Sequence, residues 1–168
     1  RFEISLLVMI RLDAVADMFN AFFEIHPKYR AESTCAVANL RYFLGKGRKF
    51  NVSTMSDVSE AIRFLTPIVT EKIAPLLDRC MDIHSVDQLL NSGPPPRFAV
   101  SDEFNDTAAA LSLIVARMAN NPDFETLVSK YENAISGYYE EARFRFARLV
   151  EHLRRYDSQS LHNETIGS

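Results

Sequence analysis

The residue types that most often carry chemistry are few in this chain of 168 residues, and they stand far apart. No histidine has a second one at metal-ligand spacing, such as four positions away on a helix. The Gly-x-Ser-x-Gly elbow of a nucleophilic serine is also missing. We therefore expect no catalytic residue, no metal site and no cofactor, which favours a non-enzymatic protein. The histidines are His26, His84, His152 and His162.

The two cysteines, Cys35 and Cys80, are far apart and have no second pair, which argues against a disulfide framework or a thiolate metal site. Cys35 lies in an apolar segment, where an unreactive buried side chain is the simpler interpretation. The longest apolar run, Ile4 to Ile10, is too short to cross a bilayer. The net charge of −3 provides no basic field for nucleic acid. We therefore expect a cytoplasmic protein that contacts neither membrane nor nucleic acid.

A short basic turn is the one candidate anion site. Its cations are Lys46, Arg48 and Lys49, and Gly45 and Gly47 lie beside them. Glycines next to lysines can offer backbone N–H groups to an anion, but the spacing of a phosphate-binding P-loop is absent. A solvated loop is therefore the simpler interpretation, and an anion site is the alternative.

Aromatic and basic residues cluster near the C-terminus and form the candidate interface. Tyr139 and Phe144 lie beside the main apolar stripe of a predicted helix and give it a second apolar flank. Tyrosine and arginine are enriched at interface hot spots, which suggests a partner surface. Coverage by the chain itself and intrahelical pairing with nearby glutamates are the simpler interpretations. The candidate residues are Tyr138, Tyr139, Arg143, Phe144 and Arg148.

The segment from Pro122 to about Tyr156 carries these residues and is predicted to be one long helix, because its apolar residues recur every three or four positions. A shorter helix over about 101–118 precedes it. The short link between them predicts an antiparallel hairpin. The longer helix would extend beyond its partner from about Tyr138, and self-association through that part is a further possibility.

Alternating apolar residues predict a strand over residues 2–12, and further strands are predicted over 34–43 and 50–52. A helix is predicted from Asp57 to about Arg79, capped by Ser56 or by Thr54 just before it. Pro67 and Pro75 are expected to kink or break this helix. One side of it is predicted to carry Val58, Ile62, Leu65, Ile68 or Val69, Ile73 and Leu76.

Three consecutive prolines, Pro94 to Pro96, are the clearest break in the chain and favour a stiff connector over residues 94–100. The connector would divide an α+β subdomain, residues 1–93, from a helical hairpin, residues 101–157, with a polar tail over 158–168. The predicted fold class is α+β in a single domain. A small, mostly antiparallel sheet with packed helices is followed by an antiparallel helical hairpin with one long arm.

The order of segments in the first half resembles an uncharacterised bacterial family, domain of unknown function 4304, over about residues 2–91. The matching stretches are Leu44-Gly45, Phe50-Asn51-Val52, Ile73 to Asp78 and Ile83 to Leu90. These motifs are structural, so the resemblance implies a bacterial protein of this architecture and assigns no catalytic residue.

The leading hypothesis from the sequence is a non-enzymatic protein–protein interaction module of the bacterial cytoplasm. It rests on the missing catalytic motifs and on the aromatic and arginine-rich helix. The alternative is a domain or enzyme that binds a small anionic metabolite in a cleft between sheet and hairpin, near the basic turn.

Overall fold

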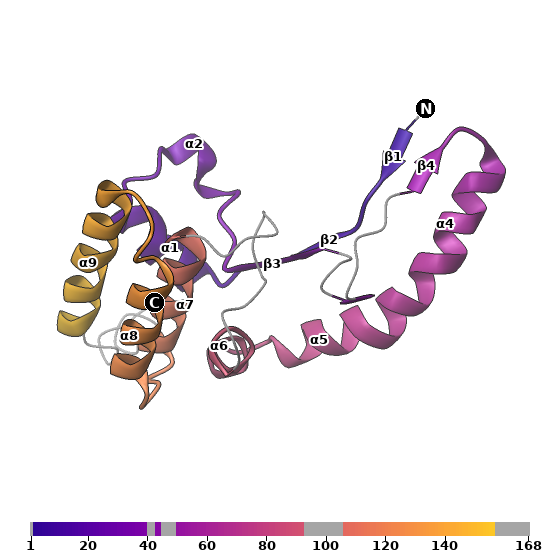
Figure 1. The fold of residues 1–168 in the computed structure, drawn as a ribbon. Coiled ribbons are helices and arrows are strands. Elements are labelled where there is room, and N and C mark those ends of the chain that lie inside the picture. Colours follow the sequence, from indigo (N-terminus) through magenta and orange to yellow (C-terminus); the bar gives the residue numbers. More distant parts are fainter. Residues whose placement is uncertain (1, 40–42, 45–49, 93–105, 157–168) are drawn as a thin grey trace, which may run out of the picture.

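The computed structural model describes residues 2–39, 43–44, 50–92 and 106–156. It confirms the α+β class, because short antiparallel strands accompany a larger set of helices (Figure 1). The predicted connector 94–100, the first residues of the predicted hairpin and the tail 158–168 lie outside the described residues. The helices are α1 (Asp13–Phe22), α2 (Pro27–Arg30), α4 (Met55–Ile68), α5 (Ala74–Arg79), α6 (Ile83–Asn91), α7 (Asp106–Met118), α8 (Phe124–Ala134) and α9 (Glu140–Arg155), with a π-helical turn, η1 (Val69–Ile73), between α4 and α5.

The strands form two small sheets instead of the single sheet predicted. β1 (Phe2–Ile4) pairs with β4 (Phe50–Val52), and β2 (Leu7–Ile10) pairs with β3 (Ala36–Asn39), both antiparallel. The prediction of one continuous strand over 2–12 is wrong, because its two halves pair with different segments. The alternation itself is preserved in β2, where every second side chain is buried.

The helices α4 and α5 and the turn η1 form a curved rod, here called the arm, at the opposite end of the molecule from α8 and α9 (Figure 1). Thr54 caps the arm, since its hydroxyl accepts from the Asp57 backbone N–H at 3.3 Å. The Asp57 carboxylate accepts in return from the Thr54 backbone N–H at 2.8 Å, which completes a capping box. Hydrogen bonds to the carboxylate from the Ser53 backbone N–H, the largest effect, and from the Thr54 backbone N–H lower the pKa of Asp57.

The two prolines disturb the arm as predicted, without ending it. Pro67 lies in the last turn of α4, and Pro75 lies in the first turn of α5. Proline has no N–H to donate, so regular α-helical bonding cannot continue through either position. The π-helical turn between them accommodates the missing donors by a change of hydrogen-bond partners.

At the other end of the molecule, α7 is the centre of a helical bundle. Every side chain from Ala108 to Ala116 is buried, and α1, α6, α8 and α9 all contact this helix. A helix that is apolar on all sides has to be covered on all sides. In Figure 1 this bundle and the arm are joined by the β2–β3 ribbon, and α6 lies between them.

The predicted long helix over Pro122–Tyr156 is wrong, because it is divided into α8 and α9. The chain leaves the helical conformation at Ile135, and Ser136 Oγ donates to the Asn133 carbonyl at 2.8 Å. Serine competes for backbone carbonyls, and Gly137 disfavours a helix interior by about 1 kcal/mol relative to alanine. The turn lets α9 pack on α7, so the second half of the predicted long helix does not project beyond the bundle.

A buried polar network joins α6 to the bundle. The two carboxylate oxygens of Asp87 accept from the side-chain amides of Asn91, at 2.7 Å, and Asn121, at 2.6 Å. Asn91 also donates to the Ser112 carbonyl at 3.0 Å and accepts from the Tyr131 hydroxyl at 2.5 Å. Burial raises the pKa of Tyr131, which keeps this hydroxyl a donor. The network fixes how α6 sits against α7 and α8.

Tyr131→Phe is expected to destabilise the fold by about 1–3 kcal/mol, because it leaves the buried Asn91 side-chain oxygen without the Tyr131 donor. Thermal unfolding followed by circular dichroism measures the loss as a fall in Tm of about 2–4 °C per kcal/mol. Tyr29→Phe is the matched control, since Tyr29 is 53% exposed, and its Tm should not change. Equal melting of the two variants would mean that the network contributes nothing to stability.

Candidate functional site

Four of the five residues of the predicted interface lie on the surface around α9. Tyr139 and Phe144 are exposed at 61% and 62%, and Arg143 and Arg148 are also exposed. Tyr138 is half-buried and packs against the core. Tyr139 precedes the first residue of α9, and its hydroxyl accepts from Arg145 at 3.2 Å.

The charges of α9 are less paired than its sequence suggests. Among the described residues, neither Arg143 nor Arg148 forms an ion pair, and of the nearby glutamates only Glu151 pairs within the helix, with Arg155 at 3.8 Å. Phe144 points away from the buried face of α9. The outer face therefore combines one exposed aromatic ring with two arginines that are available to an acidic partner.

The residues considered for catalysis or metal binding do not come together. The part of the chain that the structure describes contains no group of three His, Cys, Asp or Glu side chains able to hold a metal ion. His26 caps α2 by accepting from the Lys28 backbone N–H at 3.2 Å, and the His152 ring packs 5.5 Å from that of Phe22. The basic turn with Lys46, Arg48 and Lys49, and also His162, lie outside the described residues.

An apolar surface on the arm was not singled out from the sequence. Met55, Ile62, Val69 and Leu77, here called the outer stripe, are exposed at 77%, 60%, 39% and 39%. The prediction that Ile62 shares one side of this helix with Ile68, Ile73 and Leu76 is wrong, because those three side chains are buried and Ile62 is exposed. The sequence signal is the width of the apolar arc: at about 100° per residue, apolar side chains follow one another around about half of α4, whereas one-sided packing needs an arc of only about 100°.

The π-helical turn keeps both faces of the arm in line. On the covered side, Ile68 and Ile73 are both buried although they are five positions apart. A π-helical turn closes after more residues than an α-helical one, so such a pair can share a face. By the same argument Leu77 can share the exposed side of the arm with Val69, although eight positions separate them, and both are 39% exposed.

The hydroxyl groups beside the outer stripe are satisfied within the arm itself. Ser59 Oγ donates to the Met55 carbonyl at 3.1 Å, and Thr66 Oγ1 donates to the Ile62 carbonyl at 2.8 Å. Thr70 Oγ1 repeats the arrangement with the Thr66 carbonyl at 3.1 Å. Because these donors already have partners, burying this surface would leave none of the three hydroxyls without a hydrogen bond.

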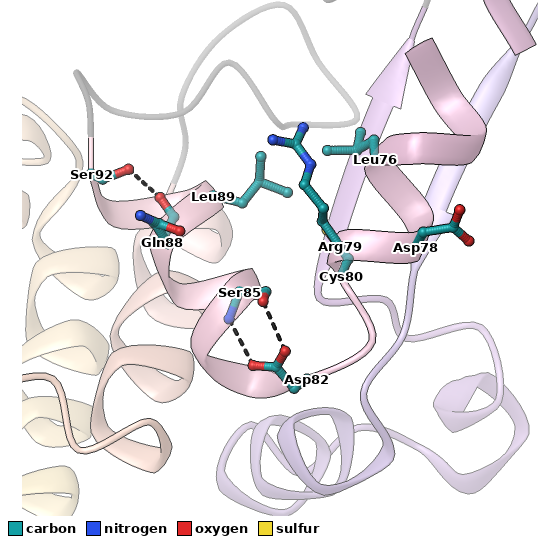
Figure 2. Close-up of a pocket in the computed structure, with 9 residues that line it drawn as sticks. All are labelled: Leu76, Asp78, Arg79, Cys80, Asp82, Ser85, Gln88, Leu89 and Ser92. Carbon is teal, nitrogen blue, oxygen red and sulfur yellow. Dashed lines mark hydrogen bonds between the residues drawn. The ribbon is translucent and has the colours of Figure 1, made fainter. Parts of the chain in front are cut away.

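A cleft of about 560 Å³ lies where α5 meets α6. Figure 2 shows Arg79 extending between Leu76 and Leu89 at this cleft. The nearby polar groups already serve the helix ends: Asp82 accepts from the Ser85 backbone N–H at 2.9 Å and from its hydroxyl at 2.8 Å (Figure 2). These bonds lower the pKa of Asp82. The cleft thus holds one arginine and no set of polar groups that converge on a ligand.

Comparison with protein-family models, curated proteins and solved structures yields no match to this chain. The likeness to domain of unknown function 4304 therefore stays a prediction. Across the described ranges, every helix is too short or too polar to span a membrane.

Both cysteines are free and buried, and burial raises the pKa of each thiol. A raised pKa keeps the thiol protonated, and only the thiolate is a nucleophile. We expect neither Cys35 nor Cys80 to react with Ellman's reagent at pH 8 in the folded protein, and both to react after denaturation. A thiol that reacts in the folded protein as fast as free cysteine would contradict the inert interpretation.

Proposed function

We propose that this protein is a non-enzymatic interaction protein that docks an amphipathic helix of a partner protein along the outer stripe. The observation that carries the proposal is an exposed apolar stripe along the arm, beside a face with Ala61 and Ile68 that is already buried in the core. Contiguous exposed apolar surface on a folded domain commonly marks an interaction site.

The spacing of the outer stripe supports a helix as the occupant. Met55, Ile62 and Val69 recur at intervals of seven, and half-buried Val58 and Leu65 lie between them. This is the a/d repeat by which two helices pack along a seam. No charged side chain lies within this seam, so the partner helix should present an uncharged apolar face of the same kind.

The strength of such docking can be bounded. Full burial of a large aliphatic side chain contributes about 1.5–3 kcal/mol. The stripe side chains expose 39–77% of their surface, so covering all four gains on the order of 5 kcal/mol. Association costs an estimated 4–15 kcal/mol, and we therefore expect weak, reversible docking unless the partner also reaches nearby residues such as the exposed Met81.

Position-specific photo-crosslinking tests the proposal. A photoreactive amino acid at Ile62 should crosslink a partner that the same group at Glu60, on the other side of α4, does not reach. Crosslinks between two copies of the chain from position 62 would identify a second copy as the partner. Equal crosslinking from both positions, or from neither, would contradict docking on the stripe.

Ile62→Glu is expected to weaken binding of the crosslinked partner at least about tenfold, about 1.4 kcal/mol, because it places a charge in an apolar contact. The unfolding free energy should change by less than about 0.5 kcal/mol, since Ile62 is 60% exposed. Isothermal titration calorimetry and urea denaturation measure the two effects. Loss of folding would instead place Ile62 in the core.

The outer face of α9 supports a second candidate function, the binding of an acidic segment of another protein. Its support is the exposed Phe144 beside Arg143 and Arg148, which have no ion-pair partner among the described residues. Because such contacts are charge-assisted, this binding should weaken with rising salt, whereas docking on the uncharged stripe should not.

Phe144→Ala with Arg148→Glu is expected to abolish binding of an acidic partner and to leave Tm within about 2 °C, because both side chains are exposed. Pull-down at low and high salt of a partner captured by a photoreactive amino acid at position 144 measures the effect, and Ile62→Glu, which leaves the α9 face unchanged, is the matched control that should keep binding it. Retained binding by the double variant would exclude the α9 face.

A further inference from the structure

A cavity of about 270 Å³ lies between α1, α7 and α9, away from the arm. Its lining combines polar groups with apolar side chains that include Phe19, Phe23 and Phe146. The rings of Phe19 and Phe23 pack against each other with centroids 4.6 Å apart. Two of the polar groups carry opposite charges: Asp106 on α7 and Arg145 on α9.

These two charges are close together, but they are not joined by a strong bond. Arg145 Nη2 lies 3.8 Å from Asp106 Oδ2, which is longer than the roughly 2.7–2.9 Å of a charge-assisted hydrogen bond. Among the described residues, the only hydrogen-bond acceptor of Arg145 is the Tyr139 hydroxyl, at 3.2 Å. Arg145 Nε is buried and has no partner there. A guanidinium group can donate five hydrogen bonds, and the described protein groups accept few of those of Arg145.

We propose that this cavity binds a hydrophobic α-amino acid, with its carboxylate on Arg145, its ammonium on Asp106 and its side chain among the phenylalanines. An α-amino acid carries both charges on one carbon atom, so they lie side by side as the protein charges do. The four groups then alternate in sign, and each charge meets an opposite one. A ligand with a carboxylate alone would place its negative charge near Asp106 with no ammonium group to compensate. A ligand with an amine alone would place its positive charge near Arg145 with no carboxylate to compensate.

The volume of the cavity limits the size of the side chain that the bound amino acid can have. Its volume is just below the roughly 300–1,000 Å³ of pockets that hold drug-sized ligands. A single phenylalanine or leucine is therefore the right scale, and the aromatic lining favours phenylalanine. The site is independent of the proposed docking surfaces, because neither the outer stripe nor Phe144 lines it.

Thermal unfolding with defined additives tests the proposal. At about 10 mM, L-phenylalanine or L-leucine should raise Tm by about 2–4 °C, as expected for a millimolar site. Glycine lacks the apolar side chain, and 3-phenylpropionate and phenethylamine each lack one charge, so all three should raise Tm by less than 1 °C. No shift with either amino acid, or equal shifts with the singly charged analogues, would overturn the assignment.

Charge-neutralising variants test the two contacts. Asp106→Asn and Arg145→Gln should each reduce the affinity for L-phenylalanine at least tenfold in NMR titrations, whereas Asp123→Asn and Arg155→Gln, which lie outside the cavity, should not. The amides of Ala110 and Ala142, which line the cavity, should shift during titration of the wild-type protein. Titration at low temperature, where circular dichroism shows each variant to be folded, separates lost binding from lost structure. Unchanged affinity in Asp106→Asn would overturn the ammonium contact.

Discussion

The structure depends on the burial of α7. Nine consecutive side chains, Ala108 to Ala116, are hidden from solvent, so four other helices have to surround this one. Such coverage is possible only if the chain after α8 turns back, which it does at Ser136 and Gly137. The same demand draws α6 onto the bundle, where burial of the Asp87 carboxylate is tolerated because both of its oxygens accept amide hydrogen bonds.

The arm, unlike α7, is covered by other described residues on one side only. Its apolar arc is wide enough for two packing partners. The exposed Leu7 and Met9 show the same incompleteness in β2, whose other face packs into the core. Surface that a fold leaves apolar without covering it costs solubility and is most simply explained by intermittent coverage in a complex. The bundle thus buries its central helix on all sides, whereas the arm keeps an exposed apolar stripe, the surface on which the proposed docking rests.

Features that depend on residues close together in the sequence can be predicted from it, whereas features that depend on packing between distant segments cannot. The α+β class, the effect of Pro67 and Pro75 and the buried Cys35 depend on neighbours in the chain, and they were predicted correctly, whereas the cap was left open between Ser56 and Thr54, and Thr54 forms it. The break between α8 and α9 at Ser136 was not predicted. The local sequence favours a break there only weakly, and the packing of α9 on α7 is what requires it.

For the candidate sites too, the sequence indicates what depends on local patterns and does not indicate what depends on distant segments. The sequence left open whether Tyr139 and Phe144 are covered by the chain itself or form a partner surface, and it favoured coverage; in the structure both are exposed, as are Arg143 and Arg148. Periodicity gives the width of the arc on the arm, but it cannot say which half is covered, and so Ile62 was grouped with Ile68, Ile73 and Leu76, which are buried. The cavity beside Arg145 could not be predicted, because its lining comes from three helices far apart in the sequence.

The carboxylates of Asp87, which is buried, and Asp106, which is partly exposed, show how a structural role differs physically from a binding role. Asp87 has a hydrogen-bond donor for each oxygen, all contributed by the fold, so a ligand would have to displace bonds that hold α6 in place. Asp106 accepts one backbone N–H, from Thr107 at 3.0 Å, and stands 3.8 Å from an arginine that has a single acceptor among the described residues. Since an incomplete set of partners near a low-dielectric lining leaves electrostatic free energy unrealised, a molecule that supplies the missing partners gains that free energy on binding. Completeness of the hydrogen-bond set, more than burial or charge, therefore separates the group that maintains the fold from the group that is poised to bind.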